Sequence, residues 1–226
     1  MSALKSLTDE HQLIAELLGA LHNYATRLRG GAAVDPADLA RFAEVFRELV
    51  DYRHHEKEEG VLLPLLARNG FDWSEGLLAE LRGEHGHVRS LMDILCQAAA
   101  KDAAMREIPE PAGGAVAPFM PSTEERRQVA EAAIAFVEVE RRHMQKEERV
   151  LLPAIRERLD ERSLERLDAE LLQFDETNAR HAGNADLFRS AAELVRRYSE
   201  DSGTLDVTGV EWTVAPVAGQ GLRRVS

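Results

Sequence analysis

Five long stretches of this chain place apolar residues three or four positions apart, and this spacing restricts its fold more than any other feature. Residues three and four apart share one face of an α-helix, so each stretch predicts an amphipathic helix that buries that face. The predicted helices span about residues 5–29, 36–67, 78–105, 122–154 and 163–198. The sequence therefore predicts an all-α fold, an antiparallel up-down four-helix bundle with an additional C-terminal fifth helix.

Two segments lack the helical spacing. Residues 107–122 hold four of the eight prolines and two adjacent glycines, a composition that predicts an exposed loop. The tail, residues 201–226, alternates Val and Trp with polar residues and is predicted to form short strands or an irregular extended wrap. The predicted division is a bundle over residues 1–160, the fifth helix over 161–200 packed on the bundle, and the tail.

Part of the sequence occurs twice. RHHEKEEGVLLP at 53–64 aligns without a gap with RHMQKEERVLLP at 142–153, and DEHQLI at 9–14 resembles GEHGHV at 83–88. The sequence therefore contains two related helix pairs. The alignment superposes His54 on His143, Glu58 on Glu147 and His11 on His85.

Six histidines and glutamates of the repeat stand at stripe positions that otherwise hold Leu, Val, Phe or Ala, so they are predicted to face the core. A buried carboxylate without a partner is costly, and two facing carboxylates also repel each other. Cations would neutralise them, with neutral imidazoles as nitrogen ligands and glutamates as oxygen ligands. The candidate metal ligands are His11, His54, Glu58, His85, His143 and Glu147.

The spacing within the repeat suits two metal ions. In His54-x3-Glu58 and His143-x3-Glu147, the imidazole and the carboxylate lie on one helix face, roughly 6 Å apart along the axis. Each glutamate could then bridge two ions, with the four histidines divided between them. This arrangement leaves room for a solvent bridge and an exogenous ligand, so the sequence predicts an open dinuclear site.

The ordered set of motifs resembles the hemerythrin-like (HHE cation-binding) family over about residues 5–160. The shared pattern is His, His-x3-Glu, His, His-x3-Glu, with DEH and GEH around the first and third histidines and EE-x2-LLP after the second and fourth. The resemblance implies a non-haem di-iron centre with two solvent-bridged Fe ions, four terminal histidines and Glu58 and Glu147 as bridges. Zinc or manganese stay open as alternatives, because nitrogen and oxygen ligands alone do not fix the ion.

The chain departs from the oxygen carriers of that family at two points, one of which is the last motif, where those proteins have His-x4-Asp and this chain has His143-x3-Glu147. Those proteins have a fifth histidine four residues after the third ligand, where this chain has Arg89. The missing ligand would leave a more open iron, which favours nitric oxide or peroxide chemistry, unless another residue replaces it. His181 on the predicted fifth helix lies on a stripe and is one candidate, although it is rather expected to pack in the core or to contact a ligand from outside.

Other polar residues near the predicted site are expected to lie outside it. His22, His55 and His87 stand beside the stripes and are predicted to be at the surface or to contact ligands from outside. His55 is the closest rival of His54, but the repeat has Met144 at the equivalent position. Glu10 and Glu84 are predicted as exposed helix-start carboxylates, the alternative being that they orient neighbouring groups.

Charge and composition restrict partners and location. With 40 acidic and 28 basic residues the net charge is −12, which disfavours nucleic acid and anionic membranes as partners. The longest uncharged apolar stretch, residues 61–67, is too short to span a bilayer. The beginning of the sequence lacks an apolar signal-peptide core and there is one cysteine, so a cytoplasmic location is expected.

The predicted function is binding of a small ligand, dioxygen, nitric oxide or peroxide, for sensing, storage or detoxification. One alternative is a di-iron enzyme that oxidises ferrous iron or decomposes peroxide, and another is an iron donor for iron–sulfur cluster repair. A third is a structural module that forms a homodimer through its fifth helix and tail, with the metal only as a staple. A zinc protease is excluded, because His55-Glu56 is not followed by a histidine at position 59.

Overall fold

The structure is a computed structural model that describes residues 3–72, 74–106, 122–182, 185–199, 211–213 and 223–225. The described chain is almost entirely helical, which confirms the predicted all-α class. The predicted loop over 107–122 lies outside the described residues except for Ser122, the N-cap of α5. The helices are α1 (Ala3–Arg29), α2 (Ala37–Phe46), η1 (Arg47–His55), η2 (Glu58–Leu62), α3 (Leu63–Arg68), α4 (Gly76–Arg106), α5 (Thr123–Lys146), η3 (Glu147–Leu151), α6 (Leu152–Arg158), α7 (Glu161–Ala182) and α8 (Ala185–Tyr198).

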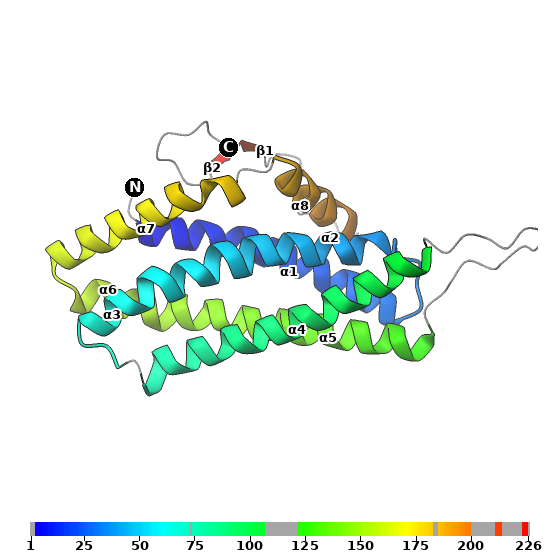
Figure 1. Cartoon of the computed structure of the whole chain (residues 1–226), viewed down its shortest axis with the longest axis horizontal. Helices are drawn as coiled ribbons and strands as arrows, with labels where there is room; N and C mark the ends of the chain where they lie inside the picture. The colour runs from blue at the N-terminus through cyan, green and yellow to red at the C-terminus, as the bar shows by residue number, and fades with distance from the viewer. Residues whose placement is uncertain are drawn as a thin grey trace, which may run out of the picture.

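Four long helical segments lie lengthwise beside one another in Figure 1: α1, the run from α2 to α3, α4, and the run from α5 to α6. Helices α7 and α8 cover one side of this bundle, α7 against α1, η1 and η2, and α8 against α1 and α2. In the tail, β1 (Glu211–Thr213) and β2 (Arg223–Val225) pair antiparallel, with Trp212 opposite Arg224.

The prediction of one continuous fifth helix over 163–198 is wrong, because α7 and α8 divide this stretch. The two helices bury their apolar faces in different parts of the core. Leu167 and Leu171 of α7 pack with the residues around α3 and α6, whereas Leu187 and Leu194 of α8 pack with α1 and α2. A regular apolar spacing cannot reveal that a helix changes the neighbour on which it packs.

The core consists of two apolar clusters. One cluster lies around α2, α8 and the C-terminal part of α1 and includes Phe42, Phe46 and Phe136. The other lies around α3, α6 and the N-terminal part of α1 and includes Leu7 and Leu66. Along the four long segments, the predicted ligands fall in the interval between the two clusters, except that on α5 Met144 of the first cluster follows His143.

A buried carboxylate fastens the end of α8 to α2. Asp38 is fully buried, and its Oδ2 accepts hydrogen bonds from the Tyr198 hydroxyl at 2.8 Å and from Arg197 at 2.6 Å. The Tyr198 ring also packs edge-on against the Tyr24 ring, with centroids 5.3 Å apart. These contacts hold α8 over the larger cluster.

The two halves of the repeat share a local widening of the helix. The π-helical stretches η2 and η3 each begin at the repeat glutamate, Glu58 or Glu147, and a Leu-Pro pair follows each of them. Proline lacks an N–H, and a π stretch before it accommodates the lost backbone hydrogen bond. A third π stretch, η1, ends at His55 and has no equivalent in α5, which stays α-helical through Lys146.

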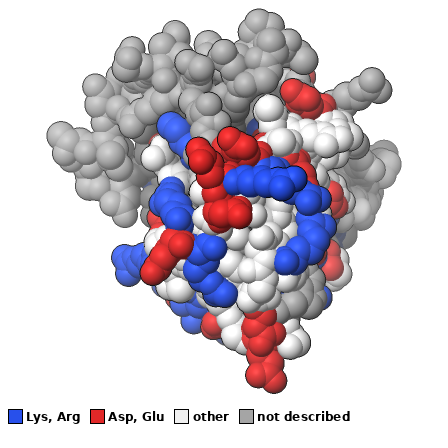
Figure 2. Space-filling model, turned by 90° about the vertical axis from the view of Figure 1, so that its left-hand side faces the viewer, with Lys and Arg blue, Asp and Glu red and all other residues white. Residues whose placement is uncertain are grey.

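The surface carries both signs of charge. Figure 2 shows one end of the molecule, where Lys and Arg side chains lie among Asp and Glu side chains around an uncharged area. Charges of both signs therefore lie side by side on this face. The described helices include none whose length and apolar character would suit a bilayer crossing.

Candidate metal centre

The structure brings the six predicted ligands together in the interval between the apolar clusters. Each of these residues is at most 2% exposed. Two groups of donor atoms form, and the atoms within each group lie within 4.8 Å of one another. One group is His11, His54, Glu58 and Glu147, and the other is His55, His85 and His143.

The two glutamates connect the groups. The Oε1 atom of Glu58 lies 3.5 Å from His54 Nε2, and its Oε2 atom lies 3.2 Å from His85 Nε2. The Glu147 carboxylate is placed in the same way, with Oε2 3.1 Å from His11 Nε2 and Oε1 3.4 Å from His143 Nε2. Each carboxylate therefore presents one oxygen to each group, an arrangement that suits a bridge between two ions.

A second layer of carboxylates orients the imidazoles. In each of the four repeat histidines Nε2 faces the centre, whereas Nδ1 lies 2.7–3.3 Å from a glutamate oxygen of another helix. A carboxylate that accepts the Nδ1–H bond keeps the Nε2 lone pair directed at a metal. The pairs are His54 with Glu10, His143 with Glu84, His11 with Glu148 and His85 with Glu59.

This layer corrects the prediction that Glu10 and Glu84 are exposed. Glu10 is 5% exposed and the Glu84 side chain 19%, because the neighbouring helix covers each of them. The alternative, that they orient neighbouring groups, agrees with their contacts to His54 and His143. The aligned segments DEH and GEH place the two glutamates at equivalent points of the repeat.

Each of these glutamates is paired with a repeat lysine. Lys57 is 1% exposed, and its Nζ lies 2.6 Å from Glu10 Oε1 and 2.6 Å from Asp175 Oδ1 of α7. Its counterpart Lys146 is 28% exposed and holds Glu84 at 2.6 Å. The repeat thus builds the same ion pair twice, once buried under α7 and once near solvent.

The electrostatic field of the site keeps its carboxylates ionised. Burial alone would raise the pKa of Glu58, but the imidazoles of His54 and His143 hold it well below its usual value. Burial would lower the pKa of His54, but Glu58 and Glu10 raise it to about 9. Burial would also lower the pKa of His143, but neighbouring glutamates, Glu147 foremost, raise it well above its usual value. A metal ion binds only the neutral imidazole, so it would have to displace the proton that these raised pKa values favour.

The donor atoms that face the centre fit a pair of metal ions. His11 Nε2, His54 Nε2, Glu58 Oε2 and both Glu147 oxygens are buried and make no hydrogen bond within the described part of the chain. Buried polar groups are normally hydrogen-bonded, so a set of nitrogen and oxygen atoms that face one region without hydrogen bonds indicates that something binds there. Neutral imidazoles and carboxylates together suit iron, manganese or zinc.

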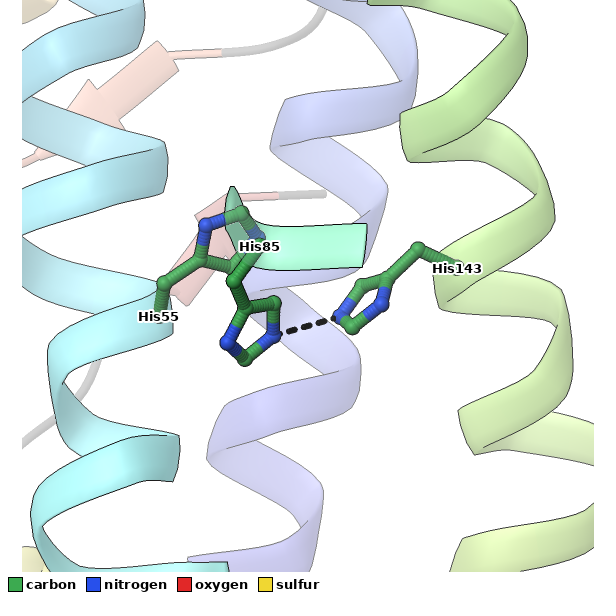
Figure 3. Close-up of side chains that lie close together, drawn as sticks. All are labelled: His55, His85 and His143. Carbon is green, nitrogen blue, oxygen red and sulfur yellow. Dashed lines mark hydrogen bonds between the residues drawn. The ribbon is translucent and has the colours of Figure 1, made fainter. Parts of the chain in front are cut away.

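The remaining histidines differ in their placement. His55 is fully buried beside His85 and His143 (Figure 3), so a surface position for it is excluded. His22 is half-buried and His87 is exposed, and neither belongs to a donor group. The side chain of His181 lies outside the described residues. Arg89 is held by Asp51 and Glu59.

Comparison with known families agrees with this geometry. The family model of the hemerythrin HHE cation-binding domain matches residues 2–117, which include His11, His54, Glu58 and His85. The match ends before α5, where the repeat supplies His143 and Glu147. A search of curated proteins and a search of solved structures each found no significant match. With half of its length matched, the chain belongs to the hemerythrin HHE cation-binding domain family.

Proposed function

We propose that the chain is a di-iron protein whose centre binds a small ligand, dioxygen, nitric oxide or peroxide. His11, His54, His85 and His143 would be terminal ligands, and Glu58 and Glu147 would bridge the ions. The observation that carries the proposal is that each glutamate presents one oxygen to each of two groups of buried donors. Short connections between α1 and α2 and between α3 and α4 support the antiparallel bundle over residues 1–160 that the family resemblance implies.

The residues of the chain would define how the ions react. The outer carboxylates fix each imidazole with its Nε2 lone pair inward, and the two apolar clusters on either side limit the access of water. Bound iron would supply a redox-active Lewis acid with coordination positions left for a small ligand. A nitrogen-rich donor set stabilises strongly oxidised iron less than a carboxylate-rich one, which favours ligand binding over difficult oxidations.

Elemental analysis of protein purified without oxygen tests the metal content, and we expect two Fe per chain. His85→Ala should lower this content, because His85 Nε2 faces Glu58 and His143. His87→Ala is the matched control, because His87 lies on the same helix and is exposed. Equal metal content in both variants and the wild type would show that the ligand assignment is wrong.

Absorption spectra of the iron-loaded protein test the small ligand. Azide, nitric oxide or peroxide should change the spectrum in proportion to the iron present if coordination positions are open. An unchanged spectrum with all three would instead support a closed structural metal site. Continued turnover of peroxide or ferrous iron would favour the enzyme alternative over stoichiometric binding.

A further inference from the structure

We propose that His55 is a fifth imidazole ligand of the metal centre and that Glu140 orients it. The inference rests on the proposed function and adds to it. The two ions would then have unequal donor sets, with three histidines (His55, His85, His143) for one ion and two (His11, His54) for the other.

The first argument is the local shape of the helix. In an α-helix, neighbouring residues point about 100° apart, so His54 and His55 could not both face one centre. The π stretch η1 ends at His55, and its wider turn reduces the rotation between successive residues. Both imidazoles are fully buried. The equivalent part of α5 has no π stretch, and Met144 stands there in place of His55.

The second argument is that the His55 ring has no hydrogen bond that explains its burial. Neither of its nitrogens is hydrogen-bonded within the described chain, although the ring is 0% exposed. Its Nε2 lies 3.4 Å from Oε2 of Glu140, which is equally buried and whose two oxygens also lack hydrogen bonds. A buried pair of this kind without hydrogen bonds is costly.

A metal ion would resolve this arrangement. In the four repeat histidines one ring nitrogen faces a carboxylate and the other faces the centre, as is usual for metal-bound histidine. His55 has the first of these features through Glu140. It therefore belongs to the same pattern, with its carboxylate supplied by α5.

The third argument is the geometry of the three rings in Figure 3. The rings of His55 and His85 are stacked with centroids 4.0 Å apart, and His85 Nε2 lies 3.1 Å from His143 Nε2. Two nitrogens each about 2.1 Å from one ion are about 3 Å apart at a right angle and at most about 4.2 Å apart. One donor nitrogen from each ring lies within 4.8 Å of the others, so a small adjustment places all three on one ion.

Cobalt(II) binding tests the proposal, because its absorption reports the ligands of each ion. The variant His55→Met introduces the residue that the second half of the repeat has at this position. We expect two binding steps in the wild type and a loss of at least 10-fold in the affinity of one step in His55→Met. Glu140→Gln should weaken the same step by about 10- to 100-fold, the usual effect of removing a group that orients a ligand. His87→Ala should leave both steps unchanged.

The outcomes separate this inference from the proposed function. Failure of the wild type to bind cobalt would contradict both. Two steps of unchanged affinity in His55→Met would overturn the role of His55 and leave the proposed function intact. Proton NMR of the cobalt-loaded wild type with ¹⁵N-labelled histidine avoids any folding defect of a variant. Five strongly shifted imidazole N–H signals are expected, and four would refute the proposal.

Discussion

Replacing Lys57 by methionine should destabilise the protein far more than the same change at Lys146. The two lysines occupy equivalent positions of the repeat and differ mainly in burial, with exposed side-chain fractions of 1% and 28%. Methionine keeps most of the length of the side chain and removes the charge. The pair of variants therefore isolates the contribution of burial to one kind of ion pair.

The magnitude follows from the contacts of each ammonium group. Lys57→Met removes the closest cation from the buried Glu10, and breaking a buried ion pair costs about 3–5 kcal/mol. Arg53 still lies 3.1 Å from Glu10, so we expect the lower end, about 3 kcal/mol. Lys146→Met breaks contacts that water screens, and its expected cost is about 0–1 kcal/mol.

Thermal unfolding measures the difference. For a chain of this size each kcal/mol shifts Tm by about 2–4 °C, so Lys57→Met should lower Tm by about 6–12 °C and Lys146→Met by at most about 4 °C. The samples must have equal metal content, because a bound metal stabilises the folded state. Equal shifts in the two variants would refute the reasoning from burial.

Three further predictions concern the core and the pH dependence. Tyr198→Phe should cost about 1.5 kcal/mol in urea unfolding, because it removes a hydrogen bond to the buried Asp38. Burial and this bond raise the pKa of Tyr198 above its usual value of 10. The stabilisation by the neutral phenol is therefore complete below pH 10 and is lost as the pH rises further. The stability of Tyr198→Phe should not show this loss. Phe136→Ala should cost about 3–5 kcal/mol in the same assay and leave the metal content unchanged, because the ring is fully buried in the larger apolar cluster. The affinity for cobalt(II) should fall as the pH is lowered from 8 to 6, because a metal must displace protons from His54 and His143, whose pKa values are raised. An affinity that does not depend on pH would contradict the assignment of these two histidines as ligands.

The sequence predicted the helical class and the convergence of six side chains, because both depend on the spacing of residues within single helices. The position of His55 could not be predicted in this way. A helical projection assumes a constant rotation per residue, and η1 breaks this assumption at that position. A clue was present in the repeat, where His55 stands opposite Met144 and is the one histidine without a counterpart in its segment.

The outer carboxylates were predicted less well for a different reason. Whether Glu10 is exposed depends on how close the neighbouring helix and α7 come, and no spacing within α1 contains that information. The division between α7 and α8 has a similar origin, because the two helices pack on different clusters. Contacts between segments determine the burial of Glu10 and the division between α7 and α8. Periodicity within a segment determines the helical class and the convergence of the six side chains.

The polar interval between the two apolar clusters has a consequence for how the molecule unfolds. The clusters are separate, so the ions would add to the helices themselves a further connection between the two ends of the bundle. Without ions, the ends are expected to open as independent cooperative units, which hydrogen exchange would detect as two sets of amides with different opening free energies. Metal loading would merge them into a single unit, so the centre would make the whole bundle cooperative.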